Sequence, residues 1–147
     1  MQDAFHMLLY RAFHAQRGFL RSCLGRSGLG AGQPKLLVYL YLHGPCSQRE
    51  LASYFEIDPA AVCRMLASLE QNSFVERAEN ETCRRTDRVC LTEQGLAEAK
   101  TWQENYLTMD SILLRGFSEQ EREQFASFLA RACGNFHAKK EDDACGT

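Results

Sequence analysis

Two helix-start signals occur close together in the middle of the chain, and the spacing of the hydrophobic residues changes after them. Ser47-Gln48-Arg49-Glu50 is a capping box, in which the Ser47 hydroxyl and the Glu50 carboxylate each accept a hydrogen bond from the other residue's backbone N–H. Asp58-Pro59 supplies an N-cap followed by proline at the first helical position. From Phe74 onward, short β-compatible runs replace the helical spacing. The order helix, helix, strand, loop, strand predicts a winged helix-turn-helix.

The hydrophobic spacing also predicts the limits of the elements. Three-and-four spacing over residues 5–24 indicates an amphipathic helix, which the glycine-rich segment 25–30 ends. A buried helix is expected from about 31–34 to 43, followed by short helices over 48–55 and 59–71. Strands at 74–78 and 88–91 form the two-stranded wing, and two more helices cover 92–115 and 118–137. The fold class is therefore mainly α with a small β part.

Length and composition limit the classes of protein. With 147 residues, 45% hydrophobic and 24% charged, the chain matches one globular domain. It contains no glycine-rich phosphate loop, no G-x-S-x-G and no H-E-x-x-H, so we expect neither an enzyme nor a cofactor. No apolar run approaches the ~20 residues of a membrane span, and no secretory leader is present. A cytoplasmic protein without membrane contact is the expectation.

The charge pattern means that DNA binding has to depend on the placement of arginines. The net charge is −2, divided as +4 over residues 1–45, −2 over 46–91 and −4 over 92–147. Arg64 lies opposite the predicted buried face of its helix, and no acidic residue stands one turn away to pair with it. Arginine can address a guanine edge or a phosphate, and alanines at 60 and 61 allow close approach to DNA. The DNA-binding candidates are Ser47, Gln48, Pro59, Ala60, Ala61, Cys63, Arg64, Ser68, Arg84, Arg85 and Arg88.

Several motifs occur in one order between Leu29 and Gly95. They are Leu29-x-x-Gly32-Gln33-x-x-Leu36-Leu37, Ser47-Gln48-x-Glu50-Leu51-Ala52, Asp58 to Glu70 with Val62-x-Arg64 inside it, Phe74-Val75-x-Arg77, Arg84-Arg85, and Val89-x-Leu91-Thr92-x-x-Gly95. With these motifs in this order and spacing, the chain resembles the multiple antibiotic resistance regulator (MarR) family of bacterial transcription factors over about residues 5–137. The resemblance implies a dimeric regulator of double-stranded DNA, more often a repressor, with Arg85 inserted in a minor groove.

The chain departs from the family pattern at two positions. Ser73 stands where the family usually has glycine before the first wing strand, and we expect Asn72 to take the left-handed turn instead. Cys83 stands where the family usually has an aspartate that orients the wing arginines, a role that Asp87 could take over. The geometry of the wing is therefore left open by the sequence.

The chain has seven cysteines and four histidines, which are its candidate redox and metal-binding residues. The seven cysteines include no C-x-x-C pair, which favours reduced thiols over disulfides. Cys63 and Cys83 each lie beside arginine in the predicted DNA-facing parts, so a redox-sensing regulator is an alternative, while Cys23, Cys90 and Cys133 are expected to pack as small hydrophobes. The pairs Cys133 with His137 and His6 with His14 do not predict a metal site.

The helices outside the winged part have apolar stripes that a small core does not cover. We therefore expect a homodimer in which residues 1–30 and 92–137 carry the dimerisation helices. Residues 31–91 form the DNA-binding lobe, the domain spans 1–137, and 138–147 form a disordered tail. The resemblance implies a small-molecule effector between the two parts, and leaves open which of Tyr10, His14, Arg17, Tyr39 and Trp102 contact it. A winged-helix protein-interaction module without DNA binding is the remaining alternative.

Overall fold

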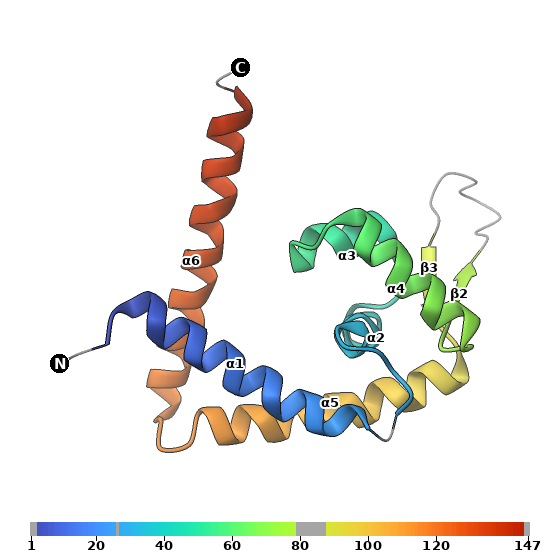
Figure 1. Cartoon of the computed structure of the whole chain (residues 1–147), viewed down its shortest axis with the longest axis horizontal. Coiled ribbons are helices and arrows are strands. Elements are labelled where there is room, and N and C mark those ends of the chain that lie inside the picture. Colours follow the sequence, from blue (N-terminus) through green and yellow to red (C-terminus); the bar gives the residue numbers. More distant parts are fainter. Residues whose placement is uncertain (1–2, 26, 79–87, 146–147) are drawn as a thin grey trace. The chain divides into compact units, whose positions relative to one another are not determined.

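The computed structural model describes residues 3–25, 27–78 and 88–145. These form two compact units, Met1–Met109 and Asp110–Thr147, each of which is described by itself. The first unit contains α1 (Phe5–Leu24), α2 (Gln33–His43), β1 (Cys46–Ser47), α3 (Gln48–Phe55), α4 (Pro59–Gln71), β2 (Val75–Ala78), β3 (Arg88–Leu91) and most of α5 (Glu93–Leu113) (Figure 1). The second contains the end of α5 and all of α6 (Glu119–Cys145). The mainly helical winged fold predicted from the sequence is confirmed.

The described residues form a three-stranded antiparallel sheet in the order β1-β3-β2. Val75 pairs with Leu91 and Ala78 with Arg88 between the two wing strands, as the hairpin prediction requires. On the other side of β3, Cys46 pairs with Val89 and Ser47 with Arg88. The wing was predicted with two strands, and β1 was missed because two residues are too few to show an alternating pattern.

The core of the first unit lies between α2, the helix-turn-helix, the sheet and the first half of α5. Its largest fully buried side chains are Trp102, Leu36, Leu37, Leu51, Leu66, Leu69, Val62 and Val89. The apolar run of α2 is buried nearly all round, as its composition predicted. Removing this much apolar surface from water is the main stabilising contribution, roughly 1.5–3 kcal/mol for each large side chain. The core thereby holds α3 and α4 against the sheet.

The turn after α4 has a geometry different from the expected one. Phe74 N donates to Leu69 O at 2.9 Å and Ser73 N to Glu70 O at 3.0 Å, which is the hydrogen-bond pattern of a Schellman motif. The left-handed residue of that motif is Ser73, with φ of 63°, whereas Asn72 has φ of −88°. The expectation for Asn72 is therefore wrong. The residue directly before the buried Phe74 adopts the left-handed conformation, and in this chain that residue is Ser73.

The start of α5 is fastened to the residues before β2. Thr92 N donates to Phe74 O at 3.1 Å, and Thr92 Oγ1 accepts from Gly95 N at 2.9 Å, so Thr92 caps α5 as predicted. A Cβ added at Gly95 would overlap the Phe74 carbonyl oxygen. Glycine at this position lets the helix pass directly over the backbone of the preceding turn.

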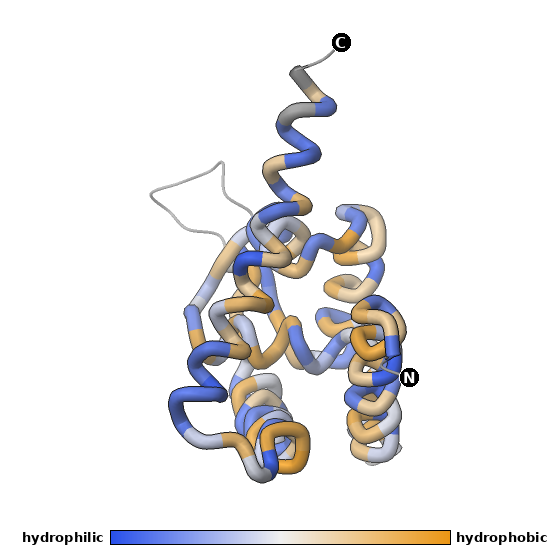
Figure 2. Tube along the Cα trace, turned by 90° about the vertical axis from the view of Figure 1, so that its left-hand side faces the viewer, coloured by the Kyte–Doolittle hydropathy of each residue, from blue (hydrophilic) through white to orange (hydrophobic). Residues whose placement is uncertain are grey.

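In the second unit, α6 begins with the predicted capping box. Ser118 N donates to Glu121 Oε2 at 2.7 Å, and Glu121 N donates to Ser118 Oγ at 3.3 Å. The helix continues to Cys145, with polar and hydrophobic positions mixed along it (Figure 2). The disordered tail predicted for 138–147 is therefore wrong over 138–145. That stretch contains alanine, lysine and glutamate and no glycine or proline before Gly146, so nothing in it stops a helix.

Candidate nucleic-acid interface and ligand pocket

The first residues of α3 are held by a complete capping box. Ser47 N donates to Glu50 Oε2 at 2.6 Å, and Glu50 N donates to Ser47 Oγ at 3.1 Å. The hydrogen bonds from Ser47 lower the pKa of Glu50 and keep its carboxylate charged. Gln48, half-buried, accepts a long hydrogen bond of 3.5 Å from Arg77 Nη2. The two candidates, the N-cap Ser47 and the first helical residue Gln48, thus lie at the N-terminal end of α3, in defined orientations.

The helix α4 exposes the side that the sequence predicted to meet DNA. Asp58 caps it by accepting from Ala61 N at 3.3 Å. The candidates Pro59, Ala60, Cys63 and Arg64 are exposed, and Ala61 and Ser68 are half-buried. Val62, Leu66 and Leu69 are buried on the opposite side. The exposed side therefore presents small side chains around one arginine, a surface that is able to approach base edges.

The wing candidates divide into described and undescribed positions. Arg84, Arg85 and Cys83 lie outside the described residues, as does Asp87. Arg88, the first residue of β3, is exposed, and its Nη1 donates to Pro45 O at 3.1 Å. This hydrogen bond ties the base of the wing to the segment that leads into α3.

A second arginine at the base of the wing had no predicted role. Arg77 of β2 contacts Gln48 of α3 and pairs through Nε with Glu70 Oε2 of α4 at 3.4 Å. The motif Phe74-Val75-x-Arg77 marked the residue, but Gln48 is 29 positions away in the chain and Glu70 lies in the preceding helix. Sequence spacing alone therefore did not connect it with the candidate interface.

The thiols differ in their surroundings. Cys63 is exposed on α4, and its role in redox sensing stays a hypothesis. Burial raises the pKa of the Cys46 thiol to about 11. Cys23 and Cys90 are half-buried, but Cys133, expected to pack as a small hydrophobe, is exposed in the single chain. Across the described ranges, no three histidine, cysteine or acidic side chains gather in a way that could hold a metal ion. In those same ranges no helix has the length and apolarity needed to cross a membrane.

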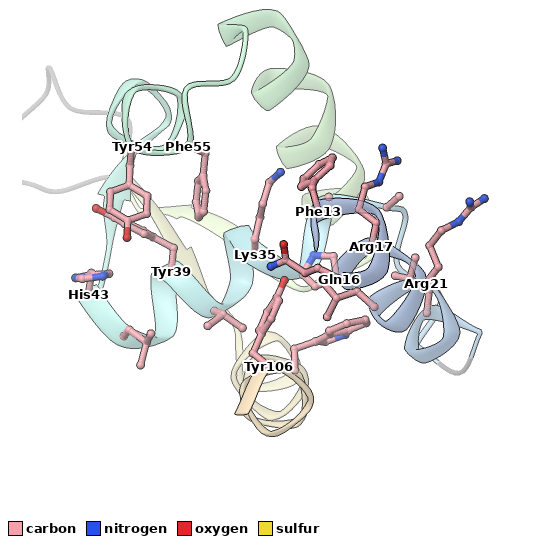
Figure 3. A pocket seen from close by; sticks show the side chains of 18 residues that line it. Phe13, Gln16, Arg17, Arg21, Lys35, Tyr39, His43, Tyr54, Phe55 and Tyr106 are labelled. Atoms are coloured by element: carbon pink, nitrogen blue, oxygen red, sulfur yellow. The ribbon is translucent and has the colours of Figure 1, made fainter. Parts of the chain in front are cut away.

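A pocket of about 630 Å³ lies within the first unit (Figure 3). Residues of α1, α2, α3 and α5 and of the turn before α2 line it: Phe13, Gln16, Arg17, Leu20, Arg21, Leu24, Ala31, Gly32, Pro34, Lys35, Val38, Tyr39, Leu42, His43, Tyr54, Phe55, Trp102 and Tyr106. Of the five positions that the sequence left open, Arg17, Tyr39 and Trp102 are in this lining, and Tyr10 and His14 are not. The volume suits a drug-sized organic molecule.

Two groups of aromatic rings form much of the pocket wall. The ring centroid of Tyr39 lies 4.4 Å from that of His43, 4.6 Å from Tyr54 and 5.7 Å from Phe55. The rings of Trp102 and Tyr106 of α5 lie 6.1 Å apart. Burial raises the pKa of Tyr106 to about 12, so its phenol stays a neutral hydrogen-bond donor at physiological pH.

Comparison with known proteins agrees with this arrangement. Residues 29–86 match the model of the MarR family. The helix-turn-helix-type transcriptional regulator YdgJ of Bacillus subtilis is 30% identical over 111 residues, which cover 76% of this chain and 68% of that protein. The regulator YwhA of the same organism is 28% identical over 96 residues, 65% of this chain and 69% of that protein.

Solved structures extend the similarity to nearly the whole chain. A probable transcriptional regulator from Pseudomonas aeruginosa shares 25% identity with a TM-score of 0.74, over 88% of this chain and 97% of that one. The fold is also shared with a putative MarR family regulator from Listeria monocytogenes complexed with 26mer DNA, with a TM-score of 0.84 and 20% identity, over 95% of this chain and 92% of that one. The chain therefore belongs to the MarR family of DNA-binding helix-turn-helix transcriptional regulators.

Proposed function

We propose that the chain is a homodimeric repressor that binds an inverted-repeat operator and is released from it by a small-molecule effector in the pocket. The main observation in support is that one end of α3 lies at the candidate DNA interface and its other end lines the pocket. Its N-cap Ser47 and its first residue Gln48 lie at the candidate DNA interface, and its last two residues, Tyr54 and Phe55, line the pocket. A helix of eight residues is about 12 Å long, so one rigid element joins the two sites.

DNA contact is assigned to α4 and the wing. In helix-turn-helix modules the second helix enters the major groove with its N-terminal residues toward the base edges. On α4 these residues are Ala60, Ala61, Cys63 and Arg64, of which Arg64 has the donors for a guanine edge. Arg84 and Arg85 are proposed to reach the flanking minor groove, which attracts arginine where it is narrow.

A dimer is supported by the apolar residues that each unit leaves exposed. None of the residues of α1 is buried, and Phe5, Leu8, Leu9 and Phe13 are among its exposed side chains. In the second unit Phe128 and Phe136 are exposed to 53% and 68%. Contiguous apolar surface of this kind marks an interface, and two-fold dimers are the commonest oligomers. We assign residues 1–30 and 92–137 to that interface and 31–91 to the DNA-binding lobe.

The test is selection of bound DNA from a random pool, followed by a change of spacing in the selected site. Two recognition helices related by a two-fold axis meet equivalent grooves about 10–10.5 bp apart, so the selected site is expected to be an inverted repeat with that period. Inserting about five base pairs between the half-sites places them on opposite faces of the duplex and is expected to abolish tight binding. Unchanged affinity after the insertion would contradict the two-fold arrangement, and a control insertion of a full turn shows whether length alone matters.

A further inference from the structure

Arg77, at the base of the wing, contacts both helices of the helix-turn-helix. Its Nη2 donates to the side-chain oxygen Oε1 of Gln48, the first residue of α3, at 3.5 Å. Its Nε donates to Glu70 Oε2 of α4 at 3.4 Å. The side chain of Arg77 is 30% exposed, so these partners screen much of it from water. One guanidinium group therefore joins the strand β2 to α3 and to α4.

The contact with Arg77 decides which end of the Gln48 amide points inward. A guanidinium group has N–H donors and no acceptor, whereas a glutamine amide has an acceptor oxygen at one end and an N–H₂ donor at the other. Turning the amide over would place donors against donors, so Arg77 selects the orientation with the oxygen inward. The amide nitrogen then lies on the side away from Arg77. The cation beside the oxygen also polarises the amide, which makes its N–H groups stronger donors.

The amide nitrogen of Gln48 has no acceptor among the residues that the structure describes. Glu50, the nearest carboxylate along α3, is engaged in the capping box and accepts from Ser47 N at 2.6 Å. Gln48 is half-buried, so part of its side chain still meets water. In helix-turn-helix complexes the first helix crosses the DNA backbone, and glutamine is among the side chains that donate to phosphate oxygens. A phosphate oxygen is therefore the acceptor that suits this nitrogen.

Glu70 keeps Arg77 in the position from which it reaches Gln48. The Glu70 carboxylate accepts from Nε, the guanidinium nitrogen nearest the main chain, while the terminal Nη2 is directed to Gln48. Without this ion pair, the cation at the base of the wing would be attracted to the phosphates of the DNA itself. The same ion pair offsets the negative charge of Glu70, which lies on the DNA-binding helix α4. Arg77 is thus held within the protein and acts on DNA only through its partner.

We propose, building on the operator binding proposed above, that Arg77 is a positioning residue for DNA recognition. It holds Gln48 with the amide nitrogen outward, and that nitrogen donates a hydrogen bond to one phosphate of each operator half-site. Arg77 itself does not contact the DNA. Because Arg77 belongs to β2 and is held by Glu70 of α4, the backbone contact of α3 depends on the positions of the wing strand and of α4.

The phosphate contact is tested by replacing each phosphate of the selected operator in turn with a neutral methylphosphonate and measuring the affinity of the full chain by fluorescence anisotropy. Among the positions that weaken binding of the wild type, one in each half-site should have no effect on Gln48→Met, because that variant has already lost the donor. On the unmodified operator, Gln48→Met should bind about tenfold more weakly than the wild type. The control Lys139→Met, which removes an exposed charge of α6, should keep the wild-type pattern. The wild-type pattern in Gln48→Met would overturn the proposal.

The positioning role of Arg77 is tested with the same set of modified operators. Arg77→Met should become insensitive at the same phosphate as Gln48→Met, and Arg77→Lys, which keeps a cationic donor beside the amide oxygen, should restore the sensitivity. Sensitivity retained in Arg77→Met would show that Gln48 needs no positioning. Sensitivity lost at a different phosphate would show that Arg77 contacts the DNA itself. Either result overturns the role of Arg77.

A second variant separates positioning from a purely structural role. Gln48→Glu keeps an acceptor for Arg77 and removes the N–H₂ donor, so urea denaturation should show a stability no lower than that of the wild type while operator affinity falls at least tenfold. Unchanged operator affinity of Gln48→Glu would contradict the outward donor. If the random pool gives no operator, the proposed function and this inference both fail. Tight operator binding that does not depend on Gln48 overturns this inference alone.

Discussion

Two exposed arginines of the candidate interface have different surroundings. Arg64 stands on the solvent side of α4 among small residues, whereas Arg88 already donates a hydrogen bond to Pro45 O. The first is free to address a base, and the second is placed to hold the wing against the segment before α3. Replacing each of these arginines by alanine should therefore change DNA binding in a different way.

We expect Arg64→Ala to relax sequence preference at one operator position, at a cost of about 1–3 kcal/mol. Arg88→Ala should weaken DNA binding by displacing the wing. It should leave the salt dependence of binding unchanged, since only the loss of a phosphate contact reduces the steepness of log K against log[salt], by about 0.9. Operator affinity measured on the selected site, on its single-position variants and over a series of salt concentrations distinguishes the two, with Lys139→Ala, an exposed residue outside both the DNA-binding and the dimerisation segments, as the control. A slope reduced in Arg88→Ala would show that Arg88 contacts a phosphate itself.

Ser73 is a non-glycine residue in the left-handed region, which is unfavourable for a residue with a Cβ. Ser73→Gly is expected to raise the free energy of unfolding by about 0.5–1 kcal/mol, since the strain exceeds the extra entropy of glycine in the unfolded chain. Urea denaturation measures the change. Ser53→Gly, in the interior of α3, is the matched control and should lower stability by a similar amount.

At the scale of elements, the packing of α5 on the turn before β2 depends on Gly95. Because a Cβ there would overlap the Phe74 carbonyl oxygen, Gly95→Ala has to shift the start of the helix. We expect a loss of about 1–3 kcal/mol in unfolding free energy. Gly134→Ala in α6, where a Cβ meets nothing within 4 Å, should instead be neutral or stabilising. Thermal unfolding of the two variants side by side tests the contrast.

The capping box of α3 makes the stability of that helix depend on pH. The folded-state pKa of Glu50 is lowered by its hydrogen bonds with Ser47, so the charged form is favoured in the folded state. Its contribution is present above the unfolded-state pKa and is lost as the pH falls through the folded-state value. The stability difference between wild type and Glu50→Gln should accordingly be largest near neutral pH and vanish in acid. A difference that grows on acidification would contradict this linkage.

At the scale of the whole molecule, the property to be tested is the oligomeric state. In each unit, aromatic and aliphatic residues of α1 or α6 stay exposed to water, and clustered exposure of this kind marks an interface. Sedimentation at micromolar concentration is expected to give about twice the 16.7 kDa of one chain. A folded species of one chain's mass would contradict the dimer and, with it, the inverted-repeat operator.

The sequence by itself determined the features that depend on neighbours in the chain. Both capping boxes, the Asp58 cap, the limits of α1 and α4 and the exposed position of Arg64 follow from spacing and local hydrogen bonding, and the structure agrees with each. The order of these elements was also enough to indicate a winged helix-turn-helix and a DNA-binding regulator.

Only the tertiary structure decided features that join distant segments. The strand β1 exists because β3 offers it a partner, and Ser73 is left-handed because Phe74 must reach the core. The pocket brings Arg17 together with Lys35 from another helix, and Phe55 from a third, and no local pattern links them. The physical reason is that a capping box fixes only a few neighbouring dihedral angles, which costs little conformational entropy. Pairing between distant segments depends on how the whole chain buries its apolar surface.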